Sequence, residues 1–192
     1  GGCFDSMVTI DGVLDWPLKD KKGCWVGLNP WPWPKDLEIK PLADRPVPFA
    51  FHGAIGGGNR EALVNQLRLS AGLQVTARGC VSKVGQPGGA IPYGDYCRKL
   101  TDIRIGLNCA WSGTEKCLHV KGRVLEYGFA GCCLLENSES WAKEWFSAGD
   151  DYIEYDDAED AAQQVNWYLS HLDHAQEIAD NLRRKVNEKY SA

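Results

Sequence analysis

Short apolar runs alternate with helix-like segments through most of this chain, from about residue 47 onward. The apolar runs are typical of buried strands, and the segments between them carry apolar residues at the three- and four-residue spacing of amphipathic helices. This alternation predicts right-handed crossovers between parallel strands. We therefore expect an α/β domain of the Rossmann-like, doubly wound type, with a mostly parallel sheet and helices on both faces. The expected strands are 47–52, 73–77, 103–107, 132–135 and 152–155.

Polar residues with short side chains mark the expected starts of several helices. Asn59, Ser138 and Asp156 each stand just before a segment with helical periodicity, where a side-chain oxygen can accept a hydrogen bond from a free backbone N–H group. The expected helices are 60–69, 93–100, a segment that includes Lys121, a segment after residue 138, a segment after residue 156, and 172–190.

Residues 1–46 differ in composition from the remainder and are expected to form an irregular arm or linker rich in proline and tryptophan, with the folded domain at 47–192. One strand is expected here, at 24–28. The run Asn29–Pro34 alternates proline with tryptophan and cannot form a helix, so an extended conformation is expected. Trp31 and Trp33 have the chemistry to stack on sugar rings, but we favour a packing role against the domain because Trp is chiefly a large packing residue.

The composition limits the class of protein. With 192 residues and 44% hydrophobic residues, the chain is long enough for one globular domain. A net charge of −5 argues against nonspecific nucleic-acid binding, and no apolar run reaches the roughly 18 residues of a transmembrane helix. The eight cysteines include no C-x-x-C pair. We expect reduced thiols in a cytoplasmic protein, with the adjacent Cys132 and Cys133 on opposite faces of a strand.

The segment from His119 to Glu136 contains the strongest candidate site. Its apolar stripe comprises Val120, Val124, Leu125 and Phe129, and Lys121 falls within the stripe in the expected first helical turn. A cation there meets both the core and the positive end of the helix dipole, so a bound anion would stabilise it. The alternative is that Lys121 extends to water and that Arg123 and Glu126 form an ordinary surface pair.

A glycine-rich turn follows the first expected strand of the domain. Gly53, Gly56, Gly57 and Gly58 would allow the backbone to approach a ligand closely, and Arg60, just inside the next helix, could reach a phosphate. The spacing matches neither a dinucleotide fingerprint nor a P-loop. The alternative is a flexible turn followed by a solvated Arg60. In a doubly wound sheet, this turn, the loop from Asn108 to His119 and the start of the Lys121 helix are all expected at the switch point in strand order.

From about residue 47 to 190, the chain resembles the carboxy-terminal half of a GT-B glycosyltransferase of the group-1 or CgeB-like kind. The parts that carry the resemblance occur in the family's order: FAFHGAIGGGNR, IRIGLN, KGRVLEYGFAG, CCLLE, WAKEWF and DYIEY. No single part is specific, but the ordered set is, and K-x-R-x-x-E is its strongest element.

The resemblance implies transfer of a sugar from a nucleotide-sugar donor, with a Rossmann-like donor-binding domain. Lys121 and Arg123 would then contact the diphosphate, and Glu126 the ribose hydroxyls. The glycine turn with Arg60 would lie near the donor, and so would Asn108 and His119. Basic residues and helix dipoles would stabilise the leaving diphosphate, so no metal and no cofactor are expected. One departure is Leu118, where many group-1 members carry a second Glu.

The resemblance also implies an amino-terminal domain with the acceptor site, which needs on the order of 100 residues and cannot be built from residues 1–46. We therefore expect this chain to be either a fragment of a longer enzyme or a donor-binding half without its partner, with little or no transferase activity of its own. The alternatives are an exostosin-like transferase domain and a non-catalytic nucleotide- or carbohydrate-binding module. A receiver-like domain is disfavoured because the acidic cluster at its strand ends is missing. A metal site at His171 and His174 is also disfavoured, since no carboxylate–His pattern supports it.

Overall fold

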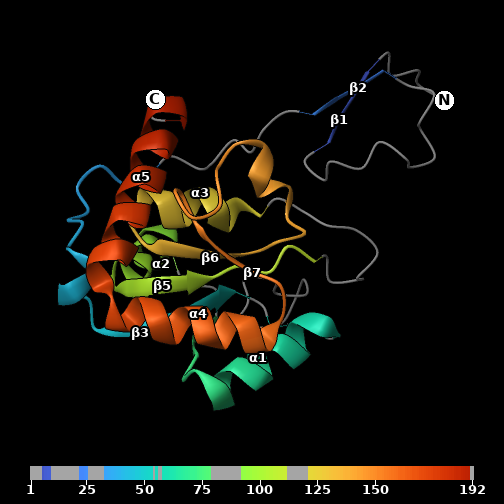
Figure 1. Cartoon of the computed structure of the whole chain (residues 1–192). Coiled ribbons are helices and arrows are strands. Elements are labelled where there is room, and N and C mark those ends of the chain that lie inside the picture. Colours follow the sequence, from blue (N-terminus) through green and yellow to red (C-terminus); the bar gives the residue numbers. More distant parts are fainter. Residues whose placement is uncertain are drawn as a thin grey trace.

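The computed structural model of the chain describes residues 6–9, 22–25, 33–53, 55, 58–78, 92–111 and 121–190. Five strands form one parallel sheet (Figure 1). In their order across the sheet they are β4 (Gln74–Arg78), β3 (Val47–Gly53), β5 (Ile103–Leu107), β6 (Cys133–Asn137) and β7 (Ile153–Tyr155). The expected doubly wound α/β fold is confirmed.

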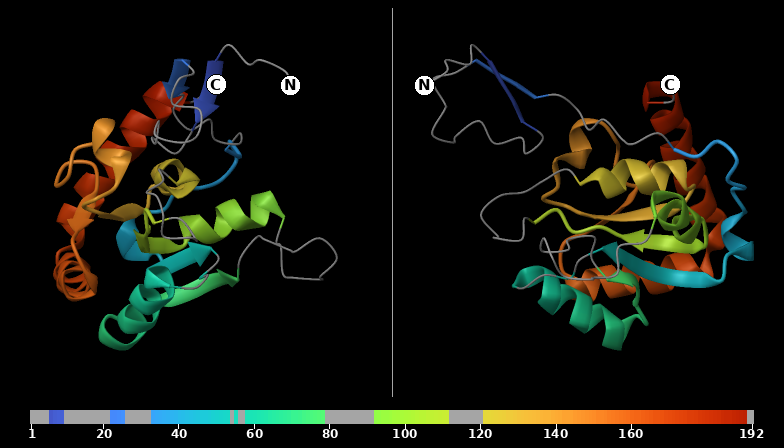
Figure 2. Two further views of the ribbon diagram at one scale, coloured as in Figure 1. Left: turned by 90° about the vertical axis from the view of Figure 1, so that its right-hand side faces the viewer. Right: turned by 180° about the vertical axis from the view of Figure 1, so that it is seen from behind.

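Helices cover both faces of this sheet (Figure 2). One face is covered by α1 (Asn59–Ser70) and α4 (Ala158–Ser170), which also contact each other. The other face is covered by α2 (Tyr93–Thr101), α3 (Gly122–Phe129) and the 3-10 helix η2 (Trp141–Glu144). Within the part of the chain that the structure describes, no helix has both the length and the hydropathy needed to cross a bilayer.

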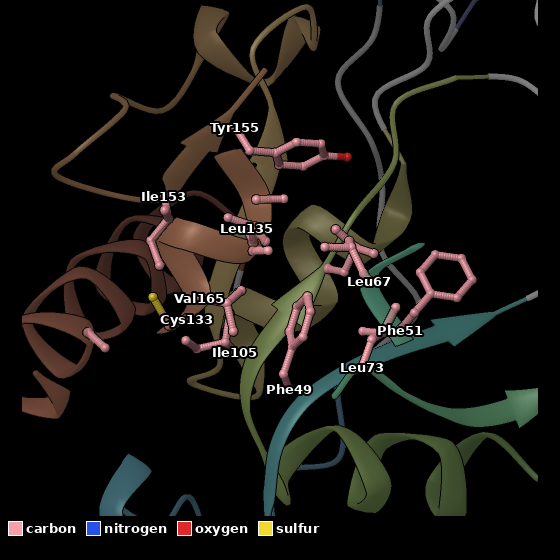
Figure 3. Packing of buried hydrophobic residues seen from close by; sticks show 14 of the residues in the cluster. Phe49, Phe51, Leu67, Leu73, Ile105, Cys133, Leu135, Ile153, Tyr155 and Val165 are labelled. Carbon is pink, nitrogen blue, oxygen red and sulfur yellow. The ribbon is translucent and has the colours of Figure 1, made fainter. Parts of the chain in front are cut away.

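The two faces have separate hydrophobic cores. Phe49 and Phe51 of β3 pack beneath α1 and α4, together with residues of the neighbouring strands (Figure 3). Ala50 lies between them in sequence and packs in the second core, beneath α2 and α3. Cys133 belongs to the first core and Cys132 to the second, so the expectation that they lie on opposite faces is confirmed.

The last helix, α5 (Leu172–Tyr190), belongs to both cores. Its first half contributes Ala175, Ile178 and Ala179 to the core beneath α1 and α4. Its second half contributes Leu182 and Val186 to the other core. It passes the amino ends of the strands, where Gln176 accepts a hydrogen bond from the backbone N–H of Leu42, and Lys185 pairs with Asp151.

Several residues before position 47 pack against the domain. Trp33 stacks on Phe129 of α3 with ring centroids 5.8 Å apart, so its expected packing role is confirmed, whereas Trp31 lies outside the described residues. Arg45 is 1% exposed and donates to the carbonyl oxygens of Lys40 and Ile103. Short elements also occur here: β1 (Ser6–Thr9), its parallel partner β2 (Lys22–Trp25), which overlaps the strand expected at 24–28, and the 3-10 helix η1 (Leu42–Asp44).

Three predicted helix caps were wrong by one or two residues. The N-caps are Gly58 instead of Asn59, Ser140 instead of Ser138, and Asp157 instead of Asp156. Ser140 and Asp157 do accept backbone hydrogen bonds of the expected kind. The type of cap was therefore predicted correctly at these two helices, but neighbouring residues with the same chemistry could not be told apart.

Candidate functional site

The switch point in strand order lies between β3 and β5. After β3 the chain crosses to β4 on one side, and after β4 it returns to β5 on the other, so the two connections leave these strands in opposite directions. Gly53 ends β3 and Asn108 follows β5. In open α/β sheets this position creates a crevice at the carboxyl ends of the strands, where ligands bind. The sequence-based location of the candidate site is consistent with this topology.

Arg123 of α3 reaches across to the end of β3. Its Nη1 atom donates a hydrogen bond of 3.0 Å to the carbonyl oxygen of His52, and its guanidinium carbon lies 4.6 Å from the centroid of the Phe51 ring. A β-carbon on Gly53 would lie only 2.6 Å from Nη1, and Gly53 has a φ of 153°. Glycine is needed at position 53 both for this backbone conformation and for the approach of the guanidinium.

Lys121 is the N-cap residue of α3, with φ −80° and ψ 145°. The expectation that it lies inside the first helical turn was wrong, because its backbone is extended and the helix begins at Gly122. Its carbonyl oxygen accepts the first helical hydrogen bond, from Val124. The partly buried Lys121 therefore stands at the amino end of the helix dipole, where backbone N–H groups favour an anion.

Glu126 faces α2 instead of forming a surface pair with Arg123. Its Oε2 atom accepts a hydrogen bond from the Tyr96 hydroxyl group, and its Oε1 atom lies near Gly122. Burial raises the pKa of the Glu126 carboxyl, while the hydrogen bond from Tyr96 and the charge of Arg123 lower it. The surface-pair alternative was therefore wrong, since each side chain contacts an element far away in sequence.

Arg60, in the first turn of α1, also points to this end of the sheet. Its Nη2 atom donates a hydrogen bond of 2.6 Å to the carbonyl oxygen of Trp111, after β5. Gly58, the N-cap of α1, has a φ of 70°, which favours glycine. Gly56, Gly57 and His119 lie outside the described residues, so the structure does not place these predicted site residues.

A buried polar network joins the ends of β5, β6 and β7. The side-chain amide of Asn108 donates a hydrogen bond of 2.6 Å to Oε2 of Glu136. The Tyr155 hydroxyl group donates a hydrogen bond of 2.8 Å to the backbone oxygen of Asn108. Both Asn108 and Glu136 are 0% exposed. Burial raises the pKa of Glu136 to about 7, against hydrogen bonds from Asn108, Ser140 and the backbone of Asn137. The Asn108 side chain thus joins the end of β5 to β6 through Glu136.

His52, at the end of β3, is kept neutral by its surroundings. It is 1% exposed, and its ring lies edge-on to Tyr96 with centroids 4.5 Å apart. Burial, together with the charges of Arg123 and Lys99, lowers the pKa of His52 to about 4. The positive charge around His52 therefore comes from Arg123 and Lys99, not from the imidazole itself.

A family model for glycosyl transferase-like proteins matches residues 39–192. The chain belongs to this family. The matched region includes the whole five-stranded sheet, both layers of helices and every predicted site residue. No curated protein sequence matches the chain.

Several solved structures share the fold of this glycosyl transferase-like chain. TarM superposes with a TM-score of 0.64 at 10% identity over 97% of this chain and 41% of its own. A glycosyltransferase from Rickettsia africae gives 0.64 at 12% identity over 96% and 59%. HepE from Anabaena, in complex with UDP and glucose, gives 0.54 at 11% identity over 78% and 45%. The chain spans between two fifths and three fifths of these structures.

Several residues at this site were missed by sequence reasoning. Glu136 follows directly on a run of buried apolar residues, and this position at the end of a strand was the one available signal. Tyr96 and His52 carried no signal, because their contacts join segments 30 or more residues apart.

Among the described residues, no three His, Cys, Asp or Glu side chains come together in a way that could hold a metal ion.

Proposed function

We propose that this chain is the donor-binding part of a GT-B glycosyltransferase of CgeB-like type, equivalent to the carboxy-terminal half of such an enzyme. The observation that carries the proposal is the position of Arg123, whose guanidinium lies at the switch point of the sheet because residue 53 is a glycine. The chain also belongs to the glycosyl transferase-like family. The partial coverage of the matched structures supports a second domain with the acceptor site.

The diphosphate of the donor would lie at the amino end of α3. Lys121 and Arg123 stand on either side of Gly122, the first residue of this helix, so two cations and the free backbone N–H groups would all be near the diphosphate. A guanidinium group matches two phosphate oxygens at once, and an ammonium group supplies a compact charge. As the bond to the sugar breaks, these groups would stabilise the negative charge on the leaving diphosphate, which is the role that a metal ion takes in other transferases.

Glu126 would bind the ribose of the donor. It lies one helical turn beyond Lys121 and Arg123, so a nucleotide with its diphosphate at the helix start can place its ribose against this carboxylate. Carboxylate oxygens accept hydrogen bonds from adjacent hydroxyl groups. HepE is known in complexes with UDP and with UDP-glucose, which favours a uridine nucleotide as the first donor to test.

Calorimetric titration of the full chain with UDP, GDP and ADP tests this proposal. We expect one of them to bind, with Lys121→Ala and Glu126→Ala weakening it about tenfold or more, since a hydrogen bond to a charged group contributes about 1.5–3 kcal/mol. Arg184→Ala is the control, because this exposed arginine lies on α5 and pairs with Glu188 of the same helix. A chain that binds none of the three nucleotides at millimolar concentration would contradict the proposal.

A further inference from the structure

The two carboxylate oxygens of Glu126 have different surroundings. Oε2 accepts the hydrogen bond from Tyr96 of α2. Oε1 lies near the exposed first residue of α3, where a β-carbon on Gly122 would be 3.7 Å away. One oxygen is therefore held from the protein interior, and the other faces the amino end of the helix, where the proposed diphosphate would bind.

From this geometry we propose that Tyr96 is a positioning residue, which fixes the Glu126 carboxylate for recognition of the ribose diol and makes α2 part of the nucleotide site. The inference rests on the proposed function of Glu126 and adds a residue to it that neither the family match nor the sequence motif indicates.

Tyr96 is itself held in place by rigid neighbours. Its ring lies edge-on to the buried His52 of β3, with centroids 4.5 Å apart at an angle of 61°. Tyr93, one turn earlier on α2, stacks on Tyr96 with ring centroids 6.1 Å apart and an interplanar angle of 18°. The hydroxyl group thus stands at a fixed point between a strand and two helices, which is the property that a positioning group needs.

A fixed carboxylate matters more for a diol than for a single hydroxyl group. Two neighbouring hydroxyl groups can donate to one carboxylate only if its plane is correctly turned, and each oxygen has two acceptor positions. With one position on Oε2 taken by Tyr96, the second position and Oε1 remain for the ligand. Without the phenol hydroxyl, the Glu126 side chain would rotate, and the preference for ribose over deoxyribose would fall.

The charges around Glu126 predict a second effect. The groups that face it are Tyr93, Tyr96 and Cys97 from α2, and Arg123 and Tyr127 from α3. The hydrogen bond from Tyr96 lowers the pKa of Glu126, so its removal raises that pKa further above the ordinary value. Nucleotide binding that needs the ionised carboxylate would then be lost at a higher pH as the solution is acidified.

The test is titration of the full chain with UDP and 2′-deoxy-UDP between pH 5 and pH 8. We expect Tyr96→Phe to lower the ratio of the two affinities about five- to tenfold and to shift the acid limb of UDP binding to higher pH. Tyr152→Phe is the matched control. Tyr152, just before β7, also donates a hydrogen bond from its hydroxyl group to a glutamate, Glu154 of β7. It should leave both readouts unchanged.

A second variant tests the orientation of Glu126 without touching Tyr96. Gly122→Ala adds a methyl group 3.7 Å from Oε1, in ordinary contact, and should weaken UDP binding severalfold at an unchanged melting temperature. Gly94→Ala is its control, since a β-carbon there meets nothing within 4 Å. If Tyr96→Phe fails to fold, this pair still tests the orientation of Oε1 on which the proposal depends.

The outcomes separate the two proposals. If the wild-type chain binds UDP and Tyr96→Phe keeps its affinity ratio and its pH profile, the positioning role is overturned and the proposed function stands. Full UDP affinity in Gly122→Ala would overturn the orientation of Oε1 toward the ligand. If the wild-type chain binds no nucleoside diphosphate, both proposals are overturned.

Discussion

The guanidinium group of Arg123 occupies the space that a side chain at Gly53 would need, because a β-carbon there would lie 2.6 Å from Nη1. Gly53→Ala should therefore displace Arg123 from the His52 carbonyl and weaken nucleotide binding about tenfold. Gly72→Ala is the control: Gly72 also has a positive φ, of 64°, but nothing lies within 4 Å of its β-carbon. Both variants should lose stability from backbone strain, and calorimetry should show lost affinity only at position 53.

Gly106 allows the ring of Tyr127 to lie against β5. A β-carbon at this position would be 2.6–2.8 Å from three ring carbons of a tyrosine that is 0% exposed. Gly106→Ala should lower the free energy of unfolding by about 1–3 kcal/mol, as overpacking does in well-packed cores. Urea denaturation measures this loss. The double variant with Tyr127→Leu should recover part of it, and no recovery would contradict the clash.

Glu136 should make the stability fall as the pH rises. Its pKa is raised in the folded protein from an ordinary 4.5 to about 7. The contribution of the protonated carboxyl to stability is therefore fully present below pH 4.5 and is lost as the pH rises through 7. The loss is about 3 kcal/mol across this window. Glu136→Gln stays uncharged and should remove this part of the slope in denaturation measured from pH 4.5 to 8. An unchanged slope would show that Glu136 ionises freely.

His52 should remain neutral well below pH 6. Its pKa is lowered from 6.5 to about 4, so its contribution to stability is present above pH 6.5 and is lost as the pH falls through 4. The chain has four histidines, which makes the ring signals tractable by NMR. The signal absent from His52→Gln identifies the residue, and a midpoint near neutral pH would contradict the buried position beside Arg123.

The cap of α4 offers a test between two adjacent residues. Asp157 accepts hydrogen bonds from the backbone N–H groups of Glu159 and Asp160 at 2.8 and 3.0 Å. Asp157→Ala should lower the free energy of unfolding by about 1 kcal/mol, the usual contribution of an N-cap residue. Asp156→Ala is the matched control and should have a smaller effect. A larger effect at Asp156 would restore the cap predicted from the sequence.

Local patterns in the sequence were sufficient for the fold. The strand Ile103–Leu107 and the helix Leu172–Tyr190 have the predicted bounds, because continuous apolar runs and helical stripes are set by residues close together in the chain. The caps at Ser140 and Asp157 show the limit of this reasoning. Where two or three capping residues follow one another, the packing of the whole helix decides which of them becomes the cap, and spacing does not record it.

The candidate site was predictable in its place but not in its contacts. The switch point follows from strand order, and it brings Gly53 and Arg123 together as the glycine turn and the K-x-R-x-x-E motif suggested. The partners of Glu126 and Arg123 come from α2 and β3, 30 and 71 residues away. The sequence shows Arg123 and Glu126 as neighbours on one helix, and only the tertiary fold shows that they point to different elements.

The helix α5 has a consequence for how the domain unfolds. Because it completes the core on one face with Ala175 and Ile178, and on the other with Leu182 and Val186, its detachment would expose both layers at once. If α5 detaches, the hydrophobic cores on both faces of the sheet are weakened together. We therefore expect the sheet and its two helical layers to unfold as one cooperative unit. The slowest-exchanging backbone amides should then occur on both sides of the sheet with similar protection, as expected for a single global opening.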